Sequence, residues 1–214
     1  MGVIVLASES SRRKKFLNSK LKDLDLDLII APISEDEPES KIGIEVFTQV
    51  EEICRFKADS AIYEISKNMP VQDIDLVLVS DTLLEDPDDS RIPLGKPMNK
   101  EEAVSMLLRL SGRRHKVWSS SAVLFPPGSK FQRIKDSDEW MVRHWTDYSI
   151  VEFENLSNDR IIQLINGNSW KNKAGSYDIM GEARENLSLI EGDEVTVLGF
   201  SSRMIDSVMK IITQ

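Results

Sequence analysis

The chain has 214 residues, 41% hydrophobic and 29% charged, a composition typical of a globular protein with one sizeable core. Its formal net charge of −9 disfavours binding to nucleic-acid polymers, so any bound anion needs a local cluster of cations. The single cysteine, Cys54, excludes a disulfide framework and a cysteine-rich zinc site. The apolar start is too short for a signal peptide or a membrane span, and we expect a cytoplasmic protein without a membrane partner.

The first half of the chain alternates predicted strands and helices. An acidic loop is expected at 33–44, and a second acidic, proline-bearing excursion at 85–93. Residue 81 follows the last predicted strand of this half and is therefore expected at a strand end. In chain order the elements are a strand at 2–7, a helix at 12–21, a strand at 24–30, a helix at 45–67 and a strand at 76–79.

The second half contains two long neighbouring strands, at 115–125 and 139–153, joined by a loop at 126–138. Such neighbours imply an antiparallel portion, so we predict an α/β fold with a mixed sheet, in a single domain over 1–214. The remaining predicted elements are a helix at 99–110 followed by Gly112, a helix from Ser157 to near Gly167, a strand at 195–198 and a last helix from Ser201.

The run Ser8-Glu9-Ser10-Ser11-Arg12-Arg13 joins the first strand to the first helix. Free backbone N–H groups at a helix start, the helix dipole and two arginines together suit a phosphate. The glycines of a Walker loop are missing. The alternative interpretation is a capped surface helix with solvated basic residues.

Three further charged residues stand at positions that favour chemistry. Lys57 falls on the inward stripe of its helix and needs an anionic partner or a polar cleft, unless it reaches solvent. Asp81 is placed to act as a general base or metal ligand, or merely to cap a turn. Lys96 lies between Gly95 and Pro97 and is either a ligand group or a solvent-facing loop residue.

Two short segments are further candidates for binding. Glu35-Asp36-Glu37 offers oxygen ligands for Mg²⁺ or Mn²⁺, although such runs are more often solvated loops. The run Asn172-Lys173-Ala174-Gly175-Ser176-Tyr177 combines a cation, small residues and an aromatic ring, and suits either close approach to a ligand or a tight turn.

In order along the chain, these pieces resemble the Maf family of septum-formation inhibitor-like nucleoside triphosphate pyrophosphatases. The paired arginines and Lys-Ala-Gly-Ser-Tyr are similar to the dTTP/UTP branch, and Val-Leu-Gly-Phe to eukaryotic Maf-like domains. The resemblance covers nearly the whole chain through Val5-Leu6-Ala7-Ser8, Lys57-Ala58, Ser80-Asp81-Thr82, Leu94-Gly95-Lys96-Pro97, Lys173-Ala174-Gly175-Ser176-Tyr177 and Val197-Leu198-Gly199-Phe200.

The resemblance implies two lobes around a long mixed sheet with flanking helices, related to the inosine-triphosphate pyrophosphatases. It implies a homodimer that cleaves the α–β bond of nucleoside triphosphates to monophosphate and pyrophosphate with Mg²⁺, Mn²⁺ or Co²⁺. The proton acceptor maps to Asp81, the acidic and metal position to Glu37 with Asp81, phosphate contacts to Ser8, Arg13, Lys57 and Lys96, and base selection to Arg12, Thr82 and Met180.

Met180 departs from the family pattern, because the dTTP/UTP branch has glutamine there and methionine cannot read a base edge through hydrogen bonds. Together with the acidic excursion at 85–93, this departure leaves an alternative function open. The alternative is a nucleotide-binding regulatory protein with little turnover, linked to control of cell division.

Overall fold

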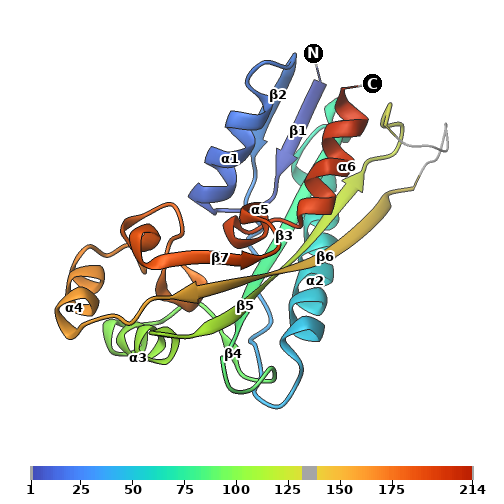
Figure 1. The fold of residues 1–214 in the computed structure, drawn as a ribbon. Coiled ribbons are helices and arrows are strands. Elements are labelled where there is room, and N and C mark those ends of the chain that lie inside the picture. Colours follow the sequence, from blue (N-terminus) through green and yellow to red (C-terminus); the bar gives the residue numbers. More distant parts are fainter. Residues whose placement is uncertain (1, 132–138, 214) are drawn as a thin grey trace.

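The computed structural model describes residues 2–131 and 139–213, and shows an α/β protein built on one sheet (Figure 1). The predicted loop at 126–138 lies outside the described residues from 132 onward. The elements are β1 (Gly2–Leu6), α1 (Ser11–Leu21), β2 (Leu26–Ile30), α2 (Val46–Asn68), η1 (Val71–Asp73), β3 (Leu76–Glu85), β4 (Pro93–Leu94), α3 (Lys100–Leu110), β5 (Arg114–Phe125), β6 (Met141–Phe153), α4 (Asn158–Asn166), η2 (Ala174–Ser176), η3 (Glu182–Asn186), β7 (Leu187–Glu191), α5 (Glu194–Leu198) and α6 (Ser202–Ile212).

The sheet is mixed, as predicted. Its strand order is β2-β1-β3-β5-β6-β7, with β4 paired to the far end of β3. β1 runs parallel to β2 and β3, whereas β3, β5, β6 and β7 pair antiparallel. The hairpin of β5 and β6 extends through the whole molecule and connects its two ends (Figure 1).

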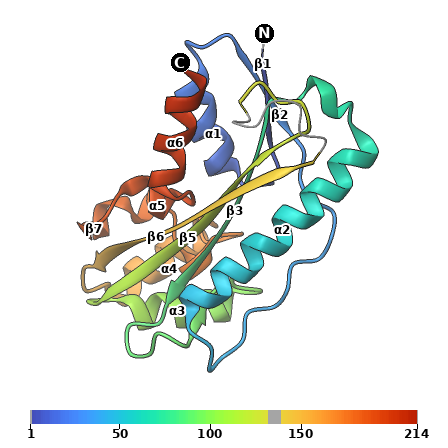
Figure 2. The ribbon, with the colours of Figure 1, turned by 90° about the vertical axis from the view of Figure 1, so that its right-hand side faces the viewer.

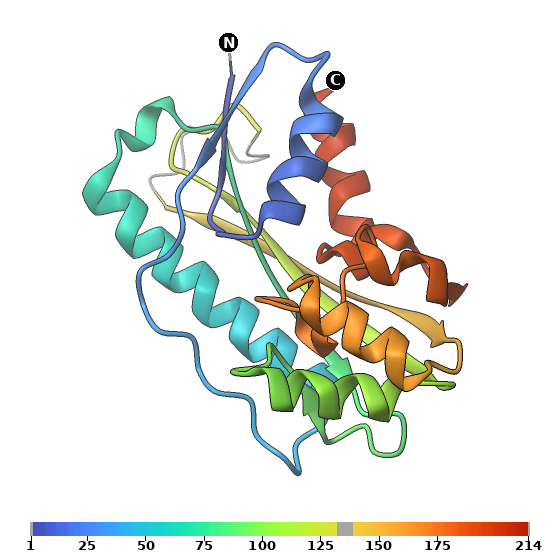
Figure 3. The same cartoon turned by 90° about the vertical axis from the view of Figure 1, so that its left-hand side faces the viewer.

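Helices cover both faces of the sheet. Figures 2 and 3 show α2 along one face and α1 with α6 on the other, while α3 and α4 stand at the opposite end of the long strands. Alternate residues of β1 and β3 contribute to one hydrophobic cluster on each face of the sheet. Val5 and Val77 pack toward α2, and Ile4, Leu6 and Leu78 toward α1 and α6. The apolar run at 76–79 is therefore buried on both faces.

Two predictions about local structure were wrong. Residues 195–198 lie in helix α5 and not in a strand, because Asp193 Oδ1 accepts a hydrogen bond from Val195 N at 2.8 Å and Gly199 ends the helix with a left-handed φ of 114°. A four-residue apolar run does not distinguish strand from helix.

Asp81 does not end its strand, because β3 continues to Glu85. Its antiparallel partner β5 stays paired throughout, with Asp81 opposite Ser120. Only the parallel neighbour β1 stops, at Leu6 opposite Leu78. Asp81 therefore lies beyond the carboxyl end of β1, inside the sheet.

None of the helices in the described part of the chain has both the length and the hydropathy needed to cross a bilayer.

Candidate active site

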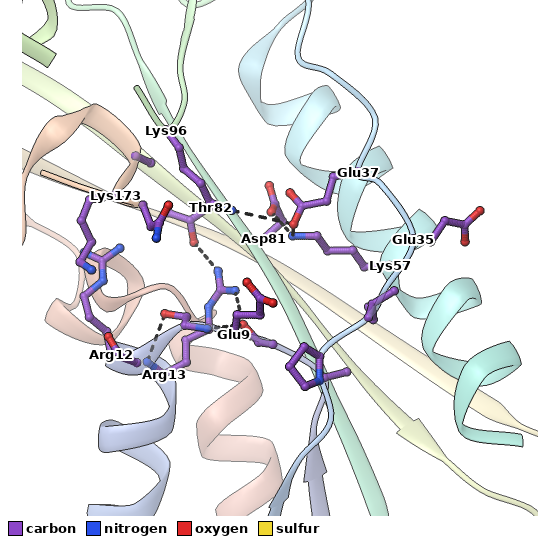
Figure 4. Close-up of a pocket in the computed structure, with 18 of the residues that line it drawn as sticks. Glu9, Arg12, Arg13, Glu35, Glu37, Lys57, Asp81, Thr82, Lys96 and Lys173 are labelled. Atoms are coloured by element: carbon purple, nitrogen blue, oxygen red, sulfur yellow. Dashed lines mark hydrogen bonds and ion pairs between the residues drawn. The ribbon is translucent and has the colours of Figure 1, made fainter. Parts of the chain in front are cut away.

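A cavity of about 620 Å³ opens where β1 ends and the chain turns into α1 (Figure 4). Ligand sites of open α/β sheets form at this kind of strand end. Five acidic and five basic residues line the cavity, so cations are concentrated here relative to the acidic chain. The lining consists of Ala7, Ser8, Glu9, Ser10, Ser11, Arg12, Arg13, Pro32, Ile33, Ser34, Glu35, Asp36, Glu37, Lys57, Asp81, Thr82, Lys96, Asn172, Lys173 and Ala174.

A buried lysine joins two carboxylates on the α2 side of the cavity. Asp81 has the same strand parity as Val77 and Val79, so its side chain faces α2. There Lys57 Nζ lies 2.5 Å from Asp81 Oδ1 and 2.8 Å from Glu37 Oε1. Lys57 is only 8% exposed, which excludes the solvent-reaching alternative.

Glu37 is ionised more readily than a free glutamate. Burial works against its charge, but the charge and hydrogen bond of Lys57, with Lys96 and Arg13 beyond, outweigh burial and lower the pKa of Glu37. Lys96 is mostly exposed, with its Nζ 3.9 Å from Glu37 Oε1. This side of the cavity therefore holds two acidic side chains that share the Lys57 amino group.

The opposite wall presents Arg12 and Lys173 (Figure 4). Both side chains are near Asp178, at 3.8 Å and 3.9 Å respectively. Burial lowers the pKa of Arg12 and of Lys173, and Arg12 Nε is buried without an acceptor among the described residues. Such donors are suited to an incoming anion.

Arg13, predicted as a phosphate contact, is 8% exposed and bonded to the protein. Its Nε donates to Gly199 O at 2.8 Å and its Nη1 to Ser80 O at 2.7 Å. Nη1 also reaches Ser8 Oγ at 3.2 Å, and Nη2 donates to Thr82 Oγ1 at 2.9 Å. Burial lowers the pKa of Arg13, with the Asp81 charge acting in the opposite direction. Ser8 and Thr82 thus line the cavity while holding this guanidinium.

The structure brings together all the predicted site residues except one. Met180 is 65% exposed and lies outside the described lining of the cavity. Lys173 and Asp178 were not among the predicted site residues. Lys173 had a signal, as the cation of the run at 172–177, whereas nothing in the sequence marked Asp178 as the neighbour of both Arg12 and Lys173.

Asp81 and Glu37 fit a divalent cation only in part. Their oxygens converge on one point, now the Lys57 ammonium, and two carboxylates with substrate phosphates are a common Mg²⁺ ligand set. Within residues 2–131 and 139–213 no group of three or more His, Cys, Asp or Glu is placed to hold a metal. The fit therefore requires phosphate oxygens from a substrate.

Gly199 leaves room for Arg13, and its replacement tests that contact. A Cβ on Gly199 would lie 2.9 Å from Arg13 Nε, at a φ of 114°. We expect Gly199→Ala to lower the free energy of unfolding by about 1–3 kcal/mol, measured by urea denaturation. Gly43→Ala is the matched control, because Gly43 has a φ of 97° with nothing within 4 Å. If both variants lost the same free energy of unfolding, the contact of the new Cβ with Arg13 would contribute nothing to the loss.

A buried aromatic cluster anchors the Lys173 wall to β5. Tyr177 follows the cavity-lining residues, and its hydroxyl is 2.8 Å from His115 Nε2. Both rings contact Phe153, with centroids 6.1 Å away from His115 and 5.1 Å away from Tyr177. Burial lowers the pKa of His115 to about 4 and raises the pKa of Tyr177. The cluster is therefore neutral at physiological pH.

Acidification is expected to destabilise this cluster. Between pH 6.5 and about 4 the unfolded chain binds a proton at residue 115 that the folded chain does not, so stability falls as pH falls. From pH 7 to pH 5 this amounts to about 2 kcal/mol. Denaturant titrations at pH 7 and pH 5 should show that the wild type loses about 2 kcal/mol more of its free energy of unfolding than His115→Gln does. If the stability of the wild type and of His115→Gln depended on pH in the same way, the lowered pKa of His115 would be contradicted.

The chain is similar in sequence to curated proteins over nearly its whole length. The chain is 32% identical over 211 residues to the dTTP/UTP pyrophosphatase of Clostridium acetobutylicum, covering 98% of this chain and 96% of that protein. It is 28% identical over 213 residues to the dTTP/UTP pyrophosphatase of Pyrococcus furiosus, covering 99% and 96%.

A solved structure shares the fold. A HAM1 protein from Coxiella burnetii superposes with a TM-score of 0.52 at 14% identity, over 100% of this chain and 99% of that one. This likeness confirms the predicted α/β fold. The family model described as Maf-like protein matches residues 3–211. The chain therefore belongs to the Maf-like protein family.

Proposed function

We propose that the protein is a metal-dependent nucleoside triphosphate pyrophosphatase that releases monophosphate and pyrophosphate. The observation that carries the proposal is the gathering of Arg12, Lys173 and Lys96 around Asp81 and Glu37 in one cavity of an acidic chain. A triphosphate brings about four negative charges, which such a cation cluster neutralises. The names of the full-length relatives support the same activity.

The chemistry assigned to the chain is mostly positioning and charge stabilisation. Arg12, Lys96 and Lys173 bind the phosphates, with the free N–H groups at the start of α1. Asp81 accepts the proton of a water whose oxygen bonds to the α-phosphorus, while the bond from that phosphorus to the bridging oxygen breaks and pyrophosphate leaves. Lys57 holds the Asp81 carboxylate at 2.5 Å. A divalent cation held by Glu37 and Asp81 with phosphate oxygens would supply further charge neutralisation.

A nucleotide panel tests the proposal. The protein is incubated with canonical and modified nucleoside triphosphates plus Mg²⁺, Mn²⁺ or Co²⁺, and pyrophosphate and monophosphate are measured. We expect release with dTTP, UTP or modified nucleotides, following the names of the relatives. Release of orthophosphate and nucleoside diphosphate in equal amounts would show that the β–γ bond is cleaved and not the α–β bond.

A second function is favoured by Met180, which replaces an amide and lies outside the described cavity lining. Without an amide at that position, the cavity binds phosphates but has lost one means of aligning the base. The protein would then be a nucleotide-binding regulator with little turnover, linked to cell division. Binding across the panel without pyrophosphate release would favour this function.

We extend the proposal to one domain over 1–214 that forms a homodimer in the cytoplasm. The single seven-stranded sheet formed by the described residues supports one domain. One buried cysteine without a disulfide suits a reducing compartment. The homodimer rests on the family resemblance, and sedimentation of the purified protein tests it.

A further inference from the structure

We infer that Arg13 is a positioning residue that holds Asp81 in place and does not bind the substrate phosphates. The inference rests on the proposed function and changes the assignment of one cation within it. The starting observation is that Arg13 bonds four protein acceptors and is 8% exposed. A guanidinium has five N–H donors, so at most one is left for a ligand.

The Arg13 side chain replaces β1 along the edge of β3. The last backbone bond between these strands joins Ala7 N to Leu78 O at 2.9 Å. Carbonyls on one edge of a strand recur at every second residue, so the next one facing the missing strand is Ser80 O. Arg13 Nη1 donates to it at 2.7 Å. The guanidinium thus satisfies a buried carbonyl that the end of β1 leaves free.

The contacts lie on both sides of Asp81 in sequence. Arg13 binds the backbone carbonyl of Ser80 through Nη1 and the side-chain hydroxyl of Thr82 through Nη2, so the residues immediately before and after Asp81 are both held. The Asp81 side chain itself points to the other face, to Lys57. The strand between two fixed neighbours has little freedom to rotate, and the direction of the Asp81 carboxylate is set through the backbone.

A buried polar network extends this support to the start of α6. Gly199 O accepts from Arg13 Nε at 2.8 Å and from Ser80 Oγ at 2.7 Å. Ser80 Oγ is 2.8 Å from Ser121 Oγ, which accepts from Ser201 N at 2.8 Å. Thr82 Oγ1 is 2.9 Å from Ser119 Oγ. A phosphate that took the Nη1 donor of Arg13 would leave the buried Ser80 carbonyl without its donor, at a cost of about 1–3 kcal/mol.

Arg12, one residue earlier, is the contrast. Its Nε has no acceptor among the described residues, and its nearest acidic partner, Asp178, is 3.8 Å away. The two arginines therefore have different roles. Arg12 is available to bind an anion, whereas Arg13 is hydrogen-bonded to the strand.

The test compares Arg13→Lys with Arg12→Lys in the full chain. Steady-state pyrophosphate release gives kcat and KM, and calorimetry with inorganic tripolyphosphate and Mg²⁺ gives a phosphate affinity that needs neither a base nor turnover. For Arg13→Lys we expect kcat to fall about 100-fold, the cost of a misplaced catalytic group, with KM and tripolyphosphate affinity within threefold of wild type. For Arg12→Lys we expect both KM and the tripolyphosphate dissociation constant to rise.

A second variant covers the case in which Arg13→Lys does not fold. Thr82→Val alone removes the acceptor of Nη2 and leaves Arg13 in place, so we expect kcat to fall while tripolyphosphate affinity stays within threefold of wild type. Where Arg13→Lys does fold, adding Thr82→Val to it lowers kcat no further if Arg13 acts through this contact. Loss of tripolyphosphate binding in Arg13→Lys with kcat kept, or strictly multiplicative kcat losses in the double variant, would overturn the inference. If the wild type hydrolyses no nucleotide in the panel, the proposed function fails, and the tripolyphosphate measurement still decides whether Arg13 contacts phosphate.

Discussion

Replacing Asp81 by Asn is expected to lower kcat for pyrophosphate release by about 10³-fold, within the range of a lost general base. Asparagine keeps the size of the side chain and an oxygen toward Lys57, which also remains paired with Glu37 at 2.8 Å. The fold should therefore stay intact, as judged by circular dichroism and thermal unfolding. Turnover within tenfold of wild type would refute the role of Asp81.

A control variant tests whether the effect is specific to Asp81, and a cation titration distinguishes its role as proton acceptor from its role as metal ligand. Asp59→Asn makes the same change on the exposed side of α2 and should leave kcat unchanged. Titration with Mg²⁺ separates the two roles open to Asp81. A lost proton acceptor lowers kcat at every cation concentration, whereas a lost ligand raises the cation concentration needed, as Glu37→Gln is also expected to do.

Replacing Lys57 by Met should destabilise the protein by about 3 kcal/mol, because it leaves the Asp81 carboxylate buried without its cation. Asp81 keeps 8% of its side chain exposed, too little for water to replace the ammonium. Urea denaturation measures the loss. Pyrophosphate release should fall in parallel because Asp81 loses its orienting partner.

The pair with Asp81 is isolated by a double-mutant cycle. Lys57→Met combined with Asp81→Asn removes both charges, so the double variant should be more stable than the sum of the single losses implies, by at least about 1 kcal/mol. Lys67→Met is the matched control, an exposed lysine of the same helix, and should change stability by under about 0.5 kcal/mol. Additive losses in the cycle would show that the two charges do not stabilise one another.

The sequence was sufficient for features that depend on near neighbours in the chain. The helical spacing from Val46 to Ile65 predicted α2 and its inward lysine, and the apolar run at 76–79 predicted a strand buried on both faces. Ser157 and Ser201 were recognised as helix starts because N-capping is a contact over three residues. The order of motifs along the chain was enough to suggest the family.

The tertiary structure alone decided how the cations are used. Adjacent arginines look equivalent in the sequence, yet Arg13 is committed to β3 and Gly199, while Arg12 faces the cavity beside Asp178. The sequence also did not show where β3 ends. The strand continues past Asp81 because it pairs with β5, about 40 residues later in the chain. Such contacts join residues that are distant in sequence. They form only where a particular strand ends in the sheet, and local sequence patterns do not predict that position.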